Sequence, residues 1–291
     1  MKTIEYEVVH NSQCNSFNVE EMTCRYFPRL MHCHPEHELV LITSGYGLCF
    51  AGDGVIEMKP QHIYFIGSGL PHFFRSDNHY YQSDCKDLCH SCYVQFKDQI
   101  LPGDYRNMLG CININRLMEA GENGIEWDIS QNTRLLASFR ELTACQGFER
   151  LHLLYKILDE LGRMVDEGNR ISLLSKTELR SDDESTYCRI VEYIGMKFQD
   201  PITLEEIADH AGMNPSAVCR YFKRKTGESI FGFLLRMRIS YAKRKLTETD
   251  MAISAIAYDS GFNNLANFNV QFKKFTGYTP SQYRNLYVYP I

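Results

Sequence analysis

The chain has 291 residues, of which 44% are hydrophobic, and a net charge of -5. This length allows two domains that each bury a core. No stretch approaches the roughly 20 apolar residues that cross a bilayer, and the start of the chain has no apolar segment typical of a signal peptide. We therefore expect a cytoplasmic protein that does not contact a membrane. The 11 cysteines are odd in number and scattered, which favours reduced thiols over a disulfide framework.

Charge is divided unevenly along the chain. Residues 187–291 carry 14 Lys and Arg against 9 Asp and Glu, whereas residues 1–186 carry 17 against 27. A basic C-terminal part joined to an acidic N-terminal part is consistent with a protein whose C-terminal part binds phosphate groups.

Residues 25–96 contain short apolar runs separated by glycine, proline and aspartate. The runs lie at residues 38–43, 46–50, 55–58, 63–66 and 92–96. Runs of this length and spacing predict an antiparallel β-sandwich or barrel.

Amphipathic helices are predicted between residues 131 and 165, where large apolar residues recur at helical spacing. They either pair two subunits or pack against the rest of the same chain. Residues 166–186 are polar and charged and are the best candidate for a linker. The predicted organisation is a β-rich domain with following helices at 1–165, a linker at 166–186 and a second domain at 187–291.

Histidines and a glutamate form a candidate site in the predicted barrel. His32, His34 and Glu38 share one face of a strand, and His72 can reach them from a neighbouring strand. Three imidazoles and a carboxylate can bind Zn²⁺, Fe²⁺, Mn²⁺ or Ni²⁺, or can hydrogen-bond an organic effector or one another. We favour the second interpretation and expect no cofactor. The expected effector-binding residues are His32, His34, Glu38, Tyr46, Phe50, Tyr64 and His72, with Phe74 as a further aromatic neighbour.

Three cysteines close in sequence suggest another candidate site. Cys85, Cys89 and Cys92, with His90 between them, could bind zinc or act as a thiol sensor. Because the spacing is irregular and only three thiols are present locally, ordinary buried or loop cysteines are favoured.

A pattern in the last hundred residues occurs twice. IADHAG at 207–212 is echoed by IAYDSG at 256–261, and YFKRKTG at 221–227 by QFKKFTG at 271–277. Thr203 and Glu206 have the spacing of a capping box, and Gly212 and Gly261 permit tight turns. Helices are expected at about 216–225 and 265–275, the second burying Phe268, Phe272 and Phe275. Two helix-turn-helix units on one chain predict contact with two adjacent places on DNA.

The exposed faces of these two helices carry side chains suited to DNA. Arginine pairs with guanine edges and asparagine amides pair with adenine, whereas residues further along suit phosphates. We expect base contacts from Ser216, Arg220, Asn267 and Asn269, and phosphate contacts from Lys223, Arg224, Lys273 and Lys274. Ala217 and Asn264 complete the predicted DNA-binding set.

A helix predicted at about 231–246 joins the two units. Its apolar positions are Leu234, Leu235, Ile239, Ala242 and Leu246, and its basic face carries Arg236, Lys243, Arg244 and Lys245. Its roughly 24 Å of length would place the two recognition helices about 34 Å apart, which is one turn of DNA.

Residues 187–286 resemble the DNA-binding domain of the AraC/XylS family of bacterial transcription regulators. The resemblance rests on SGFNNLANFN at 260–269, GYTPSQYR at 277–284, and Arg238, Ala242 and Leu246 in the connecting helix. Val270 stands where many relatives carry arginine, so the second recognition helix is expected to contribute more to docking than to sequence choice.

Residues 15–100 resemble the cupin-type ligand-binding domain that precedes this tail in many family members. HCHPEHE at 32–38, Gly45 and GLPH at 69–72 resemble the two cupin motifs, although Tyr26 and Ser76 replace an expected glycine and asparagine. The implied fold class is α+β: a cupin-like β-barrel with following helices, then an all-α domain of two helix-turn-helix units joined by a linker helix.

The resemblance implies a transcriptional regulator rather than an enzyme. Its expected partners are double-stranded promoter DNA, a second copy of the chain, RNA polymerase and a small-molecule effector such as a sugar or another hydroxylated or acidic metabolite. The alternative is a metal-dependent cupin enzyme, an oxygenase or isomerase, fused to a DNA-binding tail.

Overall fold

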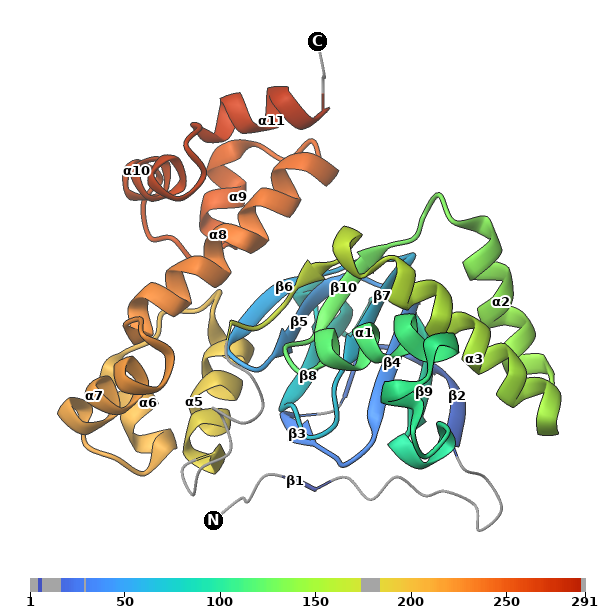
Figure 1. Ribbon diagram of the computed structural model, residues 1–291. Helices are drawn as coiled ribbons and strands as arrows, with labels where there is room; N and C mark the ends of the chain where they lie inside the picture. Colours follow the sequence, from blue (N-terminus) through green and yellow to red (C-terminus); the bar gives the residue numbers. More distant parts are fainter. Residues whose placement is uncertain (1–4, 7–16, 29, 174–183, 289–291) are drawn as a thin grey trace. The chain divides into compact units, whose positions relative to one another are not determined.

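The N-terminal part of the chain folds into two β-sheets that face each other (Figure 1). The computed structural model describes residues 5–6, 17–28, 30–173 and 184–288. It separates into a first unit, Met1–Asp182, and a second unit, Asp183–Ile291. The strands are β1 (Glu5–Tyr6), β2 (Phe17–Cys24), β3 (His32–Cys33), β4 (His37–Ser44), β5 (Gly47–Ala51), β6 (Gly54–Met58), β7 (His62–Ile66), β8 (His72–Ser76), β9 (Cys89–Phe96), β10 (Ile125–Asp128) and β11 (Asn169–Arg170).

One sheet has the strand order β1-β3-β8-β5-β6 and the other has the order β11-β10-β7-β4-β9-β2. The described pairings are antiparallel except that of β1 with β3. The predicted runs of the barrel are confirmed as β4 to β7 and β9. Strand β2 was not predicted, because its sequence mixes polar and apolar residues and its identity as a strand depends on pairing with β9 along its full length.

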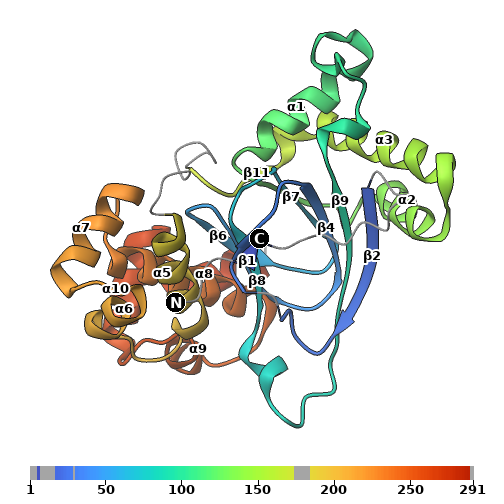
Figure 2. The same ribbon diagram turned by 90° about the horizontal axis from the view of Figure 1, so that it is seen from below.

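Three α-helices cover the outer face of the six-stranded sheet (Figure 2). They are α1 (Ile112–Gly121), α2 (Thr133–Ala144) and α3 (Gly147–Arg163), with short 3-10 turns at Asn78–Tyr81, Asp98–Ile100, Tyr105–Asn107, Leu109–Cys111 and Val165–Glu167. Leu39, Leu41, Phe65 and Val94 project from the sheet into the same apolar cluster as Leu135 and the other buried helix residues. The apolar stripes predicted for 131–165 therefore pack against the sheet of the same chain.

Residues 166–173 of the predicted linker belong to the first unit. Strand β11 pairs with β10, and the Ser172 hydroxyl donates to Asp53 Oδ1 over 2.6 Å, while the Leu173 amide donates to the same oxygen over 2.8 Å. The composition of this segment is polar, but the backbone of β11 extends the sheet by pairing with β10. Because β10 is distant in sequence, the composition of the segment does not reveal this pairing. Residues 174–183 of the predicted linker lie outside the described residues.

The second unit is helical. Its helices are α5 (Glu184–Lys197), α6 (Leu204–Ala211), α7 (Pro215–Thr226), α8 (Ile230–Glu248), α9 (Ile253–Asp259), α10 (Leu265–Thr276) and α11 (Pro280–Val288). Thr203 and Glu206 form the predicted capping box of α6, and Gly212 ends that helix in the left-handed conformation at φ 69°. The predicted fold class, α+β with a β-rich N-terminal part and a double helix-turn-helix C-terminal part, is confirmed.

Polar contacts join the two helix-turn-helix halves of this unit. The Arg238 guanidinium in α8 donates from Nε to the Phe198 carbonyl over 2.6 Å and from a terminal nitrogen to the Asp200 carbonyl over 2.8 Å. Gln199 donates to the Asp259 carbonyl over 2.7 Å. Residues between α5 and α6 are thereby fixed to α8 and to the end of α9.

Among the described helices, none is both long enough and apolar enough to cross a membrane.

Candidate functional site

Helix α7 begins with a capping arrangement that leaves its outer face available for contacts with another molecule. The Asn214 side chain accepts from the Ala217 amide over 2.8 Å, and Pro215 occupies the first turn. Val218, Tyr221 and Phe222 are buried. Successive residues turn by about 100° around a helix, so Ser216, Arg220, Lys223 and Arg224 point away from the core, and these four are exposed. Ala217 is half-buried at the side of this face.

Helix α10 repeats this arrangement fifty residues later. Asn264 caps it, because its Oδ1 accepts from the Asn267 amide over 2.7 Å. Asn267 and Asn269, the asparagines predicted to contact bases, are both exposed, and so is Asn264. Val270 occupies the middle of the outer face with 63% of its surface exposed, in the place that Arg220 holds in α7. Lys273 and Lys274 are exposed beside it.

One aromatic position of α10 differs from the prediction. Phe268 and Phe272 are buried, but Phe275 is 46% exposed. The apolar cluster around this helix includes Phe262, Phe268, Phe272 and Tyr283 and does not extend to Phe275. Helical spacing places Phe275 on the same side as Phe272, but the cluster that buries Phe272 does not include it.

The predicted basic face of the linker helix is only partly present. The predicted apolar stripe of α8 packs into the core, but Arg244 is also buried, at 1% exposure, and Arg236 is paired with Glu228 over 2.6 Å. Lys243 and Lys245 are half-buried. Helix α8 is longer and more enclosed than predicted, because helices on several sides contact it, and so fewer of its cations face solvent.

In the first unit, the predicted histidines and glutamate come together between the sheets. His32 and His72 are directly paired between β3 and β8, and Glu38 reaches them from β4 in the other sheet. Glu38 Oε2 lies 3.1 Å from His34 Nε2, and Glu38 Oε1 lies 3.4 Å from His72 Nε2. Burial alone would raise the pKa of Glu38, but the contacts with His34 and His72 outweigh it and hold that pKa well below its ordinary value. All four residues are buried.

Two of the predicted effector-binding residues lie elsewhere. Phe50 pairs with Phe73 in the register of β5 and β8 and stacks on it at 4.2 Å between ring centroids. Because adjacent strand residues point to opposite faces, Phe50 lies on the other side of the sheet from His72. Tyr46 precedes β5 in the turn and is 39% exposed. Tyr64 and Phe74 do face the cluster side, where their rings meet at 5.4 Å.

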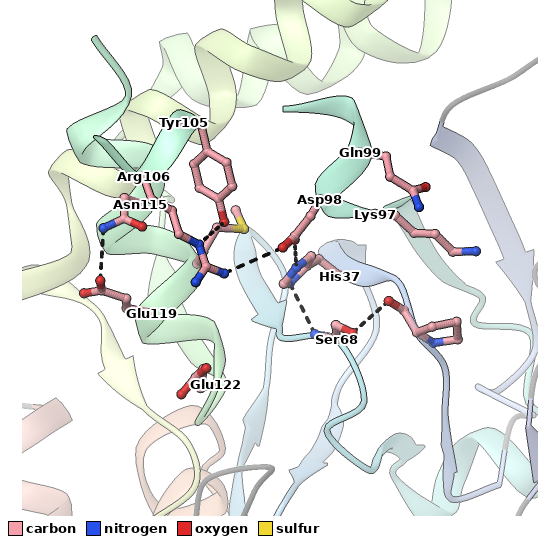
Figure 3. Close-up of a pocket in the computed structure, with 12 residues that line it drawn as sticks. His37, Ser68, Lys97, Asp98, Gln99, Tyr105, Arg106, Asn115, Glu119 and Glu122 are labelled. Atoms are coloured by element: carbon pink, nitrogen blue, oxygen red, sulfur yellow. Dashed lines mark hydrogen bonds and ion pairs between the residues drawn. The ribbon is translucent and has the colours of Figure 1, made fainter. Parts of the chain in front are cut away.

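A separate polar pocket of about 290 Å³ lies on the helix side of the six-stranded sheet (Figure 3). We call it the His37 pocket; His37, Ser68, Lys97, Asp98, Arg106 and Glu119 are among the residues that line it. His37 Nε2 donates to Asp98 Oδ1 over 2.7 Å, and its Nδ1 accepts from the Ser68 amide over 3.2 Å. Sequence reasoning missed this pocket. The sequence feature that could have indicated it is His37, a polar residue on the same face of its strand as the apolar residues Leu39 and Leu41.

Cys89 and Cys92 do not form the alternative thiol site. Both are buried in β9 and three residues apart, so they point to opposite faces of the strand. Burial raises the pKa of the Cys89 thiol to about 11 and that of Cys92 to about 12. Thiols that stay protonated at neutral pH are poor nucleophiles and poor metal ligands.

Comparisons with known proteins cover both units. Residues 207–286 match a helix-turn-helix domain model and residues 23–83 match an AraC-like ligand binding domain model. The HTH-type transcriptional activator RhaS of Escherichia fergusonii is 26% identical over 287 residues, which are 92% of this chain and 94% of that protein.

Two further matches cover a smaller share of this chain. An uncharacterized HTH-type transcriptional regulator of Staphylococcus aureus (strain COL) is 34% identical over 138 residues, and the chain spans only 18% of that protein's length. The C-terminal domain of AraT, a response regulator from Geobacillus stearothermophilus, is 30% identical; the match covers 36% of this chain and 88% of that one, with a TM-score of 0.35. The two domain models, in this order on one chain, identify an AraC-like ligand-binding domain followed by a helix-turn-helix domain.

Proposed function

We propose that this chain is a transcriptional regulator that places α7 and α10 in successive major grooves of promoter DNA. The observation that carries the proposal is the equivalence of the two helices. Each is capped by an asparagine at its start, ends at a left-handed glycine, and buries its aromatic side while exposing basic residues. Such a helix enters a major groove with its first turns near base edges and its later cations near phosphates.

Substitutions in the two helices separate base reading from phosphate binding. We expect Arg220→Ala to weaken binding to the cognate site by about 1–3 kcal/mol and to relax one base position. Lys273→Ala should weaken binding to all sequences alike and reduce the salt dependence by about one unit of slope. Fluorescence anisotropy with specific and scrambled duplexes over a salt series measures both effects.

Lys86→Ala is the matched control, because Lys86 is exposed in the first unit. It should leave affinity and salt slope unchanged. Equal affinity of Arg220→Ala and the parent for the cognate site would refute the assignment of Arg220.

A second proposal concerns the effector. The His37 pocket opens beside α1 and approaches the lower end of the size usual for small-molecule sites. Cations and carboxylates line it together: Lys97 and Arg106 share the lining with Asp98 and Glu119, and Arg106 lies 3.7 Å from Asp98. This mixture suits a small hydroxylated or zwitterionic metabolite rather than an apolar one.

A thermal-shift screen of sugars, organic acids and amino acids tests this assignment. A ligand of the pocket should raise the unfolding temperature of the parent chain but not that of Arg106→Ala. Arg116→Ala provides the control, because Arg116 lies in α1 beside the pocket but pairs with Asp166 outside it. A ligand whose shift survives Arg106→Ala binds somewhere else.

The homodimer and the contact with RNA polymerase stay predictions. Light scattering on the purified chain, with and without DNA, tests the first of them. A cytoplasmic location is likewise an expectation from the DNA-binding role.

A further inference from the structure

The connection between β8 and β9 carries three side chains that can bind a metal ion. It projects from one end of the first unit (Figure 2) and contains His79, Cys85 and Asp87. A ring nitrogen of His79, the Cys85 sulfur and a carboxylate oxygen of Asp87 all lie within 4.8 Å of one another. His79 Nε2 and Asp87 Oδ2 are 3.8 Å apart. His79 and Cys85 are half-buried and Asp87 is exposed, so an ion can reach this group, which we call the β8–β9 site, from solvent.

Two turns of the backbone bring these residues together. The Gln82 amide donates to the His79 carbonyl over 3.1 Å, and the Cys85 amide donates to the Gln82 carbonyl over 3.1 Å. A turn of this kind holds its first and fourth residues within about 7 Å of each other, so Cys85 stays near His79 although the two are not adjacent in sequence. The Cys85 sulfur also lies 4.0 Å from the carbonyl oxygen of Asp87. The backbone of this connection therefore determines the grouping.

The backbone on both sides of the site is fixed to the sheets. Ahead of the site, the Asp77 amide donates to the Tyr46 carbonyl over 2.9 Å. Behind it, the Leu88 carbonyl accepts from the Ser44 hydroxyl over 3.0 Å. The buried ring of Tyr80 anchors the turn between these two points. An ion therefore has to order only the three ligand side chains, which lowers the entropic cost of binding.

The donor set selects the kind of ion. A thiol sulfur, an imidazole nitrogen and a carboxylate oxygen are the ligands of Zn²⁺ in proteins, whereas Mg²⁺ and Ca²⁺ prefer oxygen alone. Ligand atoms about 2.0–2.3 Å from a tetrahedral Zn²⁺ lie about 3.3–3.7 Å apart, so the 3.8 Å between His79 and Asp87 needs little adjustment. Binding releases the Cys85 proton to solvent. The thiolate and the Asp87 carboxylate then balance the charge of the ion, and a water completes its coordination.

We propose that the β8–β9 site binds one divalent ion of the Zn²⁺ class through His79, Cys85 and Asp87. The ion joins the turn after β8 to the residues that lead into β9. The sequence suggested zinc binding by Cys85 together with Cys89 and Cys92, but these two are buried in β9, and the fold provides His79 and Asp87 in their place. The proposal depends neither on the DNA-binding role nor on a ligand in the His37 pocket.

Cobalt absorption spectroscopy tests the proposal, because a thiolate bound to Co²⁺ gives a charge-transfer band in the near ultraviolet. Ions held by histidine and carboxylate groups alone give no such band, so metal bound elsewhere through those groups does not interfere. The full chain is reduced, stripped with a chelator and titrated with Co²⁺. We expect a saturable band in the parent that Zn²⁺ abolishes. Cys85→Ser should lose the band, and His79→Gln should lose it at the Co²⁺ concentration that saturates the parent.

Two matched variants serve as controls. Cys145→Ser removes another half-buried thiol of the first unit, and His90→Gln removes a half-buried histidine in β9. Both should keep the parent band. Trp127, the one tryptophan of the sequence, is buried in β10, so its fluorescence shows whether the first unit of each variant is folded. The proposal is overturned if the parent shows no band, if Cys85→Ser or His79→Gln keeps it at parental strength, or if a folded control variant loses it.

Alkylation of cysteine gives a second readout that does not depend on the absorption of the metal. A thiolate bound to Zn²⁺ is a poor nucleophile, so Zn²⁺ should protect Cys85 of the parent from iodoacetamide, which mass spectrometry of peptides measures. His79→Gln should lose this protection at the same Zn²⁺ concentration. Cys145 should react at the same rate with and without Zn²⁺. Equal labelling of Cys85 in the parent under the two conditions contradicts the proposal, while the DNA-binding assays would stand.

Discussion

Arg220 and Val270 occupy equivalent places on the outer faces of α7 and α10, yet their chemistry differs. Arginine donates to base edges, whereas valine can neither donate nor accept a hydrogen bond. The apolar group that the major groove offers is the methyl of thymine. The two halves of the DNA-binding unit should therefore read their grooves by different means, the first by hydrogen bonds and the second partly by apolar contact.

Replacing thymine by uracil in the half-site of α10 removes that methyl and tests this difference. We expect the parent to lose about 0.8 kcal/mol, roughly a fourfold drop in affinity, at the contacted position. Val270→Ala should lose less from the same replacement, because it reaches the methyl less closely. Anisotropy titrations with single uracil substitutions measure the difference, and identical losses in the two proteins would rule out contact through Val270.

At the scale of elements, Gly212 and Gly261 follow the first helix of each helix-turn-helix half of the second unit, and they perform different tasks. Gly212 has φ +69°, and a Cβ added there would have no heavy atom within 4 Å, so only its backbone conformation requires glycine. Gly261 has φ +85°, and a Cβ there would lie 2.7 Å from the Phe198 carbonyl oxygen and 2.8 Å from Arg238 Nε. The second turn is thus also a point where the backbones of the two halves approach each other closely.

Alanine at each turn separates these two effects. Gly212→Ala should cost about 1–2 kcal/mol, the usual penalty for a left-handed alanine. Gly261→Ala should cost more, because the added methyl also displaces Arg238 from the Phe198 carbonyl. Urea unfolding followed by helical circular dichroism measures the free energies, while Trp127 fluorescence reports whether the first unit is unaffected. Similar losses for the two variants would show that the crowding at Gly261 relaxes without cost.

At the scale of the whole molecule, charge and geometry act together. The last 105 residues carry 14 basic against 9 acidic side chains, and the preceding part carries 17 against 27. The acidic part is repelled by DNA while the basic part is attracted, which favours orientations that present α7 and α10. Since α8 and the contacts of Arg238 hold the two recognition helices in one unit, their separation should be nearly constant.

A change in the spacing of the DNA half-sites probes that separation. Inserting about five base pairs turns the second half-site to the opposite side of the duplex, and about ten restores its side but adds a full turn of distance. We expect both insertions to reduce specific binding to that of a single half-site. Footprinting on the three duplexes measures this, and full protection of both half-sites after either insertion would contradict a rigid arrangement.

The sequence by itself was sufficient to predict the helices and turns of the helix-turn-helix units, but not the exposure of Phe275 or the burial of Arg244. Their determinants are local: Thr203 and Glu206 cap one helix, Asn214 and Asn264 begin the recognition helices, and glycine is needed wherever the backbone turns left-handed. Interactions between residues a few positions apart can be predicted from the sequence alone. Because the pattern occurs twice, each copy supports the assignment of the other.

Only the tertiary structure decided which residues of the first unit meet. Phe50 and His72 lie on opposite faces because β5 and β8 pair in one particular register, and residues 169 and 170 join the sheet because the distant strand β10 pairs with them. The orientation of the histidine rings, the burial of Arg244 and the existence of the His37 pocket likewise depend on contacts between residues far apart in sequence. Periodicity predicts the face a residue occupies within its own element, but the neighbour across that face is set by strand register and packing.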